Sequence, residues 1–433
     1  MANQITRPVG TEDVTPAQIY KWNTVETVVK DAARLFGFSE IRIPTFESTD
    51  LFCRSVGETT DVVQKEMYTV YGGGQPDPKK PLTLRPEGTA GTIRAMMQNG
   101  LLSEALPQKL FYILSCFRHE RNQKGRLREF HQFGVEMAGS ARPEADAEVI
   151  LLAKSVLDRL QLKNIVLNIN SIGCPACRAK YTEALKAYFT EYREQLCETC
   201  QSRLDRNPMR ILDCKSPEDQ KIAENAPVIL DYLCDECKAH FETVQENLRA
   251  MNVDFVINPK IVRGLDYYTK TVFEFITTDI GAQSTICAGG RYDGLIGQLG
   301  GSPTPALGFG MGIERVIMTM EAQGVEFMPS PACDVYFAPM EDAARPAVMQ
   351  LAMRLRESGI RAEFDLIGRG FKPQMKYANN IGAKYLVVIG SNELAEGKGR
   401  IKRMETGEQK DIRLDTPEHF IQDFLLAEGE AAF

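Results

Sequence analysis

The chain has 433 residues, of which 43% are hydrophobic and 25% charged, with a net charge of −7. This length predicts two or three domains, and the composition excludes a fibrous or wholly disordered protein. The net charge also excludes a bulk polycation, so any nucleic acid must be bound by local basic patches. No apolar run has the length of a transmembrane helix, and the first residues lack the apolar core of a signal peptide. We therefore expect a cytoplasmic protein with no membrane partner.

The first two thirds of the chain predict antiparallel strands with segregated helices. Residues 16–36 have apolar side chains at helical spacing and are followed by Gly37, a common residue just after a helix. The other elements expected there are strands at 38–44, 110–117, 130–137, 164–170, 253–259 and 271–277, helices at 144–161 and 312–324, and a cysteine-rich, mostly helical segment at 174–250. Residues 72–80 are expected to form a short flexible turn.

The pattern changes after residues 328–334, which contain two prolines and are expected to form a linker. Strands and helices then alternate, which predicts a small α/β domain with a largely parallel sheet. The strands are expected at 334–340, 360–365 and 384–390, and the helices at 342–358 and 371–381.

The most informative segment is FRHERNQKGRLREFHQFGVE, residues 117–136. Arg118 continues an apolar strand, where an unpaired cation would be costly. On the returning strand, Gln132, Gly134 and Glu136 share one face by the period of two. A polar row opposite an apolar row predicts the floor of a polar pocket, and arginine suits carboxylates and phosphates.

A second informative segment is ALGFGMGIER, residues 306–315. Gly308, Gly310 and Gly312 share one face of a strand, so a flat ligand could lie against this backbone. Close packing of a strand against a helix is the alternative interpretation. The sequence has no P-loop, no dinucleotide-binding glycine fingerprint and no H-E-x-x-H zinc motif.

These two segments, together with IRIPTFE at 41–47, resemble motifs 2, 3 and 1 of the class II aminoacyl-tRNA synthetases. LRPEGTA at 84–90, IVRGLDYYT at 261–269 and GGRYDGL at 289–295 resemble the signature segments of the histidyl-tRNA synthetase family. The resemblance implies an α+β fold: an antiparallel sheet flanked by helices, a helical insertion and a C-terminal α/β anticodon-binding domain. It places the catalytic domain at 1–327, the insertion at about 171–250 and the anticodon-binding domain at 331–433.

The resemblance also implies the activity: ATP-dependent attachment of histidine to its tRNA through a histidyl-adenylate, with Mg²⁺ on the ATP. Arg118 and Arg263 are the implied catalytic residues, at the α-phosphate and the amino-acid carboxylate. The family's remaining ATP contacts correspond to Glu120 at the adenine amino group, Arg126 at the γ-phosphate, Phe130 stacked on adenine and Arg315 on the phosphates.

Histidine would be held at its ammonium, carboxylate and imidazole groups. The family's ammonium contacts correspond to Glu87, Thr89 and Gln132, and its imidazole contacts to Glu136 and Tyr268. Tyr267 and Tyr292 are expected to wall the pocket. The implied partners are histidine, ATP, tRNA(His), which would meet the basic loop at 121–128, and a second copy of the chain in a homodimer.

Seven of the eleven cysteines fall between Cys174 and Cys237, in a protein expected to be cytosolic. Their Cys-x-x-Cys pairs have the spacing of a zinc site. Our preferred ligand set for a single structural zinc is Cys174, Cys177, Cys197 and Cys200. A site that combines Cys234 and Cys237 with one of the other pairs is the rival, and cysteines packed as small hydrophobic residues without metal are a third possibility.

Two other functions remain open. A non-catalytic, histidine-sensing regulatory subunit of histidine biosynthesis would keep the class II core, but such proteins usually lose the segment RGLDYY and the C-terminal domain. An RNA-binding sensor domain of a kinase is less compatible with the complete set of Arg118, Arg263 and Arg315.

Overall fold

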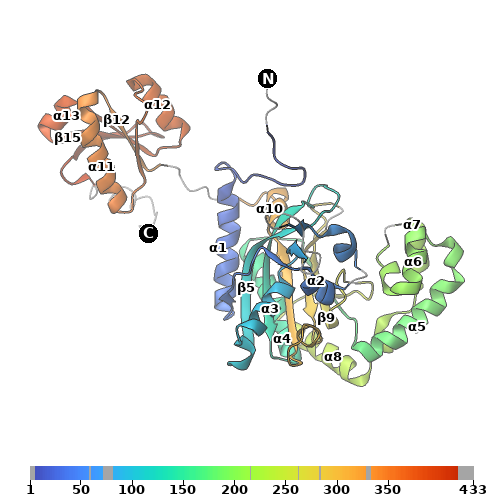
Figure 1. The fold of residues 1–433 in the computed structure, drawn as a ribbon. Coiled ribbons are helices and arrows are strands. Elements are labelled where there is room, and N and C mark those ends of the chain that lie inside the picture. Colours follow the sequence, from blue (N-terminus) through green and yellow to red (C-terminus); the bar gives the residue numbers. More distant parts are fainter. Residues whose placement is uncertain are drawn as a thin grey trace. The chain divides into compact units, whose positions relative to one another are not determined.

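The computed structural model describes residues 5–57, 60–71, 81–214, 216–261, 263–281, 284–327 and 333–417 (Figure 1). The chain divides into two compact units between residues 328 and 329. The turn expected at 72–80 and most of the linker expected at 328–334 lie outside the described residues. Among the described residues, no helix has the length and hydropathy needed to cross a membrane.

The first unit is built on an eight-stranded sheet in the order β1-β5-β6-β11-β10-β9-β7-β8. Its central strands are antiparallel, and parallel pairs occur at the two edges, β1 with β5 and β7 with β8. The strands are β1 (Ser39–Glu40), β5 (Gln108–Phe117), β6 (Glu129–Ala138), β7 (Val166–Ser171), β8 (Val256–Ile257), β9 (Thr269–Ile276), β10 (Thr285–Arg291) and β11 (Ala306–Gly312). The predicted α+β class is confirmed.

Helices bury one face of this sheet. They are α1 (Ile19–Leu35), α4 (Pro143–Arg159), α8 (Asp235–Ala250) and α10 (Ile313–Ala322). Phe133, Val135 and Met137 of β6 belong to the core beneath them, together with Val25 of α1 and Val149 of α4. Since alternate residues of a strand point to opposite faces, the polar row of β6 faces away from these helices, as the sequence predicted.

A smaller layer lies on the other side of the long hairpin. It contains a three-stranded sheet in the order β2-β4-β3 and several short helices. Its elements are β2 (Phe46–Ser48), α2 (Thr49–Val56), the π-helical turn η1 (Val62–Glu66), β3 (Thr69–Val70), β4 (Leu82–Leu84), α3 (Thr89–Gln98), η2 (Leu101–Ser103) and α9 (Leu295–Gln298).

The insertion between β7 and α8 is helical, as expected, and lies to one side of the sheet (Figure 1). It has its own apolar core, which includes Tyr181, Leu185 and Phe189. Its elements are α5 (Pro175–Glu191), η3 (Arg193–Gln195), α6 (Glu198–Arg206), η4 (Pro208–Ile211), α7 (Pro217–Ala223) and η5 (Ile229–Tyr232).

The second unit is a five-stranded sheet in the order β13-β12-β14-β15-β16. The first three strands are parallel, as predicted, and the last two are antiparallel additions. Its elements are β12 (Val335–Pro339), η6 (Asp342–Ala344), α11 (Arg345–Glu357), β13 (Ala362–Phe364), α12 (Phe371–Asn380), β14 (Tyr385–Ile389), α13 (Ser391–Glu396), β15 (Lys398–Arg403) and β16 (Gln409–Arg413).

Candidate active site

A cavity of about 780 Å³ opens in the first unit over β6, β10 and β11. Eleven of the twelve residues that the resemblance assigned to histidine and ATP line it, and they come from four separate segments. They are Glu87, Thr89, Arg118, Glu120, Arg126, Phe130, Gln132, Arg263, Tyr267, Tyr268 and Arg315. The twelfth, Glu136, is fully buried and does not line the cavity.

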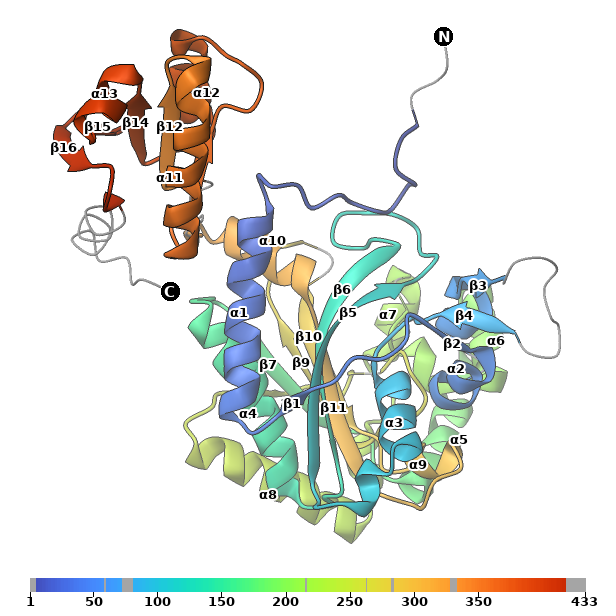
Figure 2. The ribbon, with the colours of Figure 1, turned by 60° about the vertical axis from the view of Figure 1, so that its left-hand side comes forward.

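One wall of the cavity is the loop between β5 and β6, which extends beyond the end of the sheet (Figure 2). Arg118 donates from Nε to the carbonyl of Pro86 at 2.9 Å, and its guanidinium lies 5.3 Å from the centre of the Phe130 ring. The carboxylate of Glu120 lies 3.8 Å from Arg118 and 3.1 Å from Arg126. The loop therefore presents two guanidinium groups and an aromatic face to the cavity, with one carboxylate between the cations.

Arg315, at the start of α10, holds this loop from the opposite side. Its Nε donates to the carbonyl of Gly125 at the tip of the loop at 3.0 Å, and its Nη1 donates to the carbonyl of Thr285 at 2.7 Å. Burial lowers the pKa of Arg315, and the nearby cation Arg126 lowers it further. Because neighbouring positive charges repel each other, an anion between these arginines would be stabilised.

Arg263 lies on a third side, in the loop before β9. Its Nη1 forms an ion pair with Glu274, and its guanidinium lies 5.3 Å from the centre of the Tyr268 ring. Burial alone would lower the pKa of Arg263, but Tyr268 and Glu274 outweigh it and the pKa is raised. The Nε of Arg263 is buried and has no hydrogen-bond partner among the described residues. A charged donor of this kind calls for an acceptor from a ligand.

Glu87 and Thr89 line the cavity where α3 begins. The carboxylate of Glu87 accepts hydrogen bonds from the amides of Thr89 at 2.7 Å and Ala90 at 2.9 Å. Burial raises the pKa of Glu87, and these amides oppose the rise. The start of the helix thus holds a buried carboxylate beside the cavity, a suitable counterion for an ammonium group.

Glu136 lies directly behind the lining residues. Its two carboxylate oxygens accept hydrogen bonds from the hydroxyls of Tyr112, at 2.9 Å, and Tyr292. Burial raises the pKa of Glu136 to about 8, although both hydroxyls oppose the rise. Tyr292, expected in the wall, instead stacks edge-on behind Tyr267, with ring centroids 5.4 Å apart.

The sequence analysis did not identify Tyr112 as a functional residue. Its ring occupies space that a side chain on Gly88 or Gly134 would fill: an added Cβ at either position would lie 2.3 Å from Tyr112 Cζ. The sequence did hold one signal. By the period of two, Tyr112 lies on the same face of β5 as Leu110 and Leu114, and this is the face that carries the polar row on β6. The hydrogen bond from Tyr112 to Glu136 could not be predicted, because the register between β5 and β6 was not known from the sequence.

The glycine strip of β11 is shared between the cavity and the polar residues of β6. Gly310 and Gly312 line the cavity, so a flat ligand against this backbone stays a prediction. An added Cβ at Gly308 would lie 2.2 Å from Oε2 of Glu136, and one at Gly310 would lie 2.1 Å from Nε2 of Gln132. The side chains of these two β6 residues therefore pass close to the backbone of Gly308 and Gly310. The glycines make room for the polar residues of the site itself.

Two arginines of the quoted segments support the site from behind. Arg85 donates to the carbonyls of Ile43 at 2.8 Å and Ser115 at 2.7 Å, and so joins the motif 1 segment to β5. Arg291 is completely buried and forms an ion pair with Asp146 of α4. The sequence analysis assigned no role to either side chain.

The cysteines of the insertion form two groups among the described residues. One contains Cys174, Cys177, Cys234 and Cys237, and the other contains Cys197, Cys200, Cys214 and Asp219. The structure does not bring together the two pairs of our preferred zinc set, because each belongs to a different group. The rival combination of Cys234 and Cys237 with another pair is the one that the fold assembles.

Comparison with known proteins gives consistent matches along the chain. Residues 10–316 match the family described as histidyl-tRNA synthetase, and residues 334–424 match the family described as anticodon binding domain. A histidine–tRNA ligase of Acetivibrio thermocellus is 51% identical over 94% of this chain and 97% of its own length. A histidine–tRNA ligase of Clostridium novyi is 50% identical over 95% of this chain and 97% of its own length. The solved structure of apo histidyl-tRNA synthetase from S. aureus has a TM-score of 0.82 at 36% identity and covers 97% of this chain and 100% of its own.

Proposed function

The chain belongs to the histidyl-tRNA synthetase family, and from this we propose that its cavity is where histidine reacts with ATP. The protein is a ligase that attaches histidine to tRNA at the expense of ATP. Relatives of about 50% identity over nearly the whole chain carry that activity in their names, which argues against a regulatory paralogue. The observation that carries the site assignment is the convergence of Arg118, Arg263 and Arg315, from three distant segments, on one cavity.

The first step is attack of the histidine carboxylate on the α-phosphorus of ATP, with pyrophosphate as the leaving group. The carboxylate is already ionised at neutral pH, so the step needs no general base. It needs alignment of the reactants and positive charge at the phosphates. We assign the α-phosphate and the carboxylate to Arg118 and Arg263, and the unpartnered Nε of Arg263 supports this assignment.

The remaining ATP contacts are assigned to the loop and to α10. Arg126 and Arg315 would bind the outer phosphates, Glu120 the adenine amino group and Phe130 the adenine ring. The cation of Arg118 already lies near Phe130, so a base on the other face of the ring would complete a stack. In the second step, the terminal adenosine of the tRNA takes the histidyl group on a ribose hydroxyl.

ATP-dependent synthetases of this class use Mg²⁺. Carboxylates of Glu274 and Glu314 line the cavity, and oxygen donors of this kind fit an ion that is held mainly by phosphates and water. When bound, the ion supplies further positive charge at the phosphates.

Histidine specificity is assigned to the floor. Glu87, Thr89 and Gln132 would hold the ammonium group, and Tyr268 and Glu136 the imidazole. The oxygens of Glu136 have lone pairs beyond those used by the tyrosines, so this side chain can accept one more donor. A polar floor of this kind rejects apolar amino acids strongly, because such a rival would leave buried groups unpaired.

We further propose residues 1–327 as the catalytic domain, with an insertion at about 171–250, and residues 331–433 as the anticodon-binding domain. The division at residue 328 and the family match at 334–424 support these boundaries. The loop at 121–128 would contact the acceptor stem of tRNA(His). The proposed location of the protein is the cytoplasm. A homodimer through the motif 1 segment is part of the proposal, and the half-exposed Phe46 on β2 supports an interface there.

The test is ATP–pyrophosphate exchange with each of the twenty amino acids. We expect exchange with histidine alone, reduced about 10²- to 10³-fold in Arg263→Gln, as is typical when one charged stabilising donor is removed. Arg159→Gln, on the exposed side of α4, is the matched control and should exchange normally. Absence of exchange in folded protein that still binds histidine would refute the catalytic assignment. Normal exchange by Arg263→Gln would refute the role of Arg263.

A further inference from the structure

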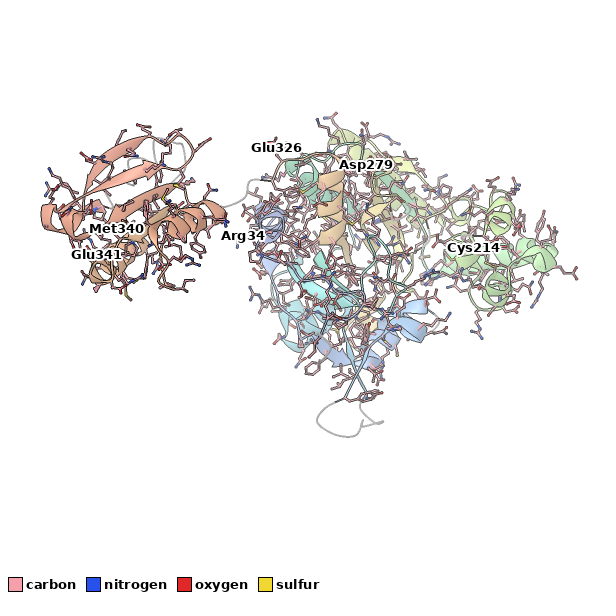
Figure 3. The ribbon with its side chains drawn as sticks, turned by 90° about the horizontal axis from the view of Figure 1, so that it is seen from above. Arg34, Cys214, Asp279, Glu326, Met340 and Glu341 are labelled. Atoms are coloured by element: carbon pink, nitrogen blue, oxygen red, sulfur yellow. The ribbon has the colours of Figure 1, made fainter. Side chains whose placement is uncertain are left out.

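The two cysteine groups of the insertion are built at the beginnings of helices. Cys174, Cys197 and Cys234 each directly precede a helix, α5, α6 and α8 respectively, and the second cysteine of each pair lies in the first turn. Backbone amides at a helix start favour negative charge. Each pair therefore lies at a helix start. Cys214 of the second group lies among the insertion helices in Figure 3.

The first group joins the two ends of the insertion. The sulfurs of Cys174, Cys177, Cys234 and Cys237 all lie within 4.8 Å of one another, and those of Cys174 and Cys177 are 3.5 Å apart. The amide of Cys234 also donates to Sγ of Cys177 at 3.1 Å. A tetrahedral zinc with bonds of about 2.3 Å places its sulfurs about 3.8 Å apart, so four such thiolates can reach one ion with little movement.

The second group contains a carboxylate in place of the fourth thiol. Sγ of Cys197 and Sγ of Cys214 are 3.8 Å apart, and Cys200 and Asp219 complete the group within 4.8 Å. The Asp219 residue is completely buried. Its Oδ1 accepts the amide of Cys197 at 3.1 Å, whereas Oδ2 has no hydrogen-bond partner among the described residues.

The surroundings of Asp219 indicate that this carboxylate binds a cation. No lysine, arginine or histidine of the described chain forms an ion pair with it. A buried carboxylate without a counterion is costly, and a divalent metal would remove that cost. Disulfides cannot do so: a bridge between Cys197 and Cys214 would leave both Cys200 and Asp219 unpaired.

We propose that the insertion binds two structural zinc ions, one held by Cys174, Cys177, Cys234 and Cys237 and one by Cys197, Cys200, Cys214 and Asp219. Closed tetrahedral sites with sulfur ligands are typical of structural zinc. This goes beyond the proposed synthetase function, which requires neither ion. It also replaces the single site expected from the sequence.

The second ion would stabilise a segment that touches the active site. Arg210, four residues before Cys214, donates from Nη2 to the carbonyl of Gly264 at 2.6 Å. Asp213 is itself a cavity-lining residue. Binding of zinc by Cys214 would therefore fix the residues that contact the loop of Arg263.

The test is the metal content of the full chain, purified without chelator and measured by plasma mass spectrometry. We expect two zinc ions per chain in the wild type. Cys237→Ser should lose only the first ion and Asp219→Ala only the second, whereas the matched control Cys53→Ser, outside both groups, should keep both. A chain with no zinc, or one zinc that survives Asp219→Ala and disappears with Cys237→Ser, would overturn the two-site proposal.

A second measurement on the wild type does not depend on the folding of variants. Native thiol titration without chelator should modify none of the seven cysteines of the two groups, and a chelator should release these thiols together with zinc. Cys116, Cys287 and Cys333 are buried and should stay unreactive in both cases. Replacement of zinc by Co²⁺ should give thiolate-to-cobalt absorption at two equivalents of metal. Complete thiol reactivity without chelator, or disulfides found by mass spectrometry in either group, would contradict the proposal.

Discussion

Replacement of Glu136 by glutamine tests whether this buried carboxyl group makes the stability of the catalytic unit depend on pH. Glu136 is completely buried, and burial raises its pKa from 4.5 to about 8. Above the unfolded pKa the unfolded chain releases this proton, while the folded chain retains it up to about pH 8. The folded state therefore binds more protons in this window, and its stability must fall as the pH rises through it.

The magnitude follows from the size of the shift. Each pKa unit corresponds to 1.36 kcal/mol, so between about pH 5 and about pH 9 the contribution of Glu136 should change by about 4 kcal/mol. Glu136→Gln has nearly the same shape and cannot ionise. The wild type should lose this free energy of unfolding as the pH rises, whereas the variant should not. The variant should therefore become more stable relative to the wild type as the pH rises.

Urea unfolding followed by the fluorescence of Trp22 is a suitable assay. Trp22 is the only tryptophan, and its ring packs on that of His131 with centroids 4.7 Å apart, so the signal reports on the first unit. The titration of His131 is common to both proteins and cancels in their difference. Glu242→Gln, at an exposed position of α8, is the matched control and should follow the wild type. A difference between Glu136→Gln and wild type that stays constant from about pH 5 to about pH 9 would refute the reasoning.

Two further substitutions test the supports of the site. Gly308→Ala should destabilise the first unit by about 1–3 kcal/mol and impair histidine-dependent exchange, because its Cβ would lie 2.1 Å from the carbonyl oxygen of Val135. Gly312→Ala is the control, because the three atoms nearest to its added Cβ belong to Arg315 and lie at 3.7 Å or more. It should stay within about 0.5 kcal/mol of wild type in urea, and equal losses in both variants would contradict this account. Arg291→Met should lower the free energy of unfolding by about 3–5 kcal/mol in the same assay, because it leaves the buried Asp146 without its guanidinium partner. A decrease below about 1 kcal/mol would show that the ion pair contributes little.

Local periodicity was sufficient to predict the long elements of the fold. The helix expected at 16–36 is α1 (Ile19–Leu35), and Gly37 follows it with a positive φ of 76°. The strand expected at 38–44 was too long, because only Ser39–Glu40 is a strand. Beyond it, the carbonyl of Ile43 bonds the side chain of Arg85, which is 42 residues away, and no local pattern shows such a partner.

Pairing between distant segments explains what the sequence could not show of the site. The period of two placed Gln132 and Glu136 on one face. It could not show the hydroxyls that donate to Glu136, which belong to Tyr112 of β5 and to Tyr292, the residue after β10. The cysteine pairs share the same spacing, so spacing alone cannot decide which pairs meet. That choice is made by the packing of the helix starts, and the contribution of Asp219 becomes visible only there.

The glycines of β11 show why the register of the sheet matters for substrate choice. Gly308 lies opposite Glu136 and Gly312 opposite Gln132 in the β6–β11 pair. A slip of one residue would bring Leu307 or Phe309 to the position of Gly308 and would move each side chain to the other face. The polar floor would then be blocked by large apolar groups. The glycines therefore support the proposed recognition of histidine, because they fix where the carboxyl group and the amide of β6 can lie.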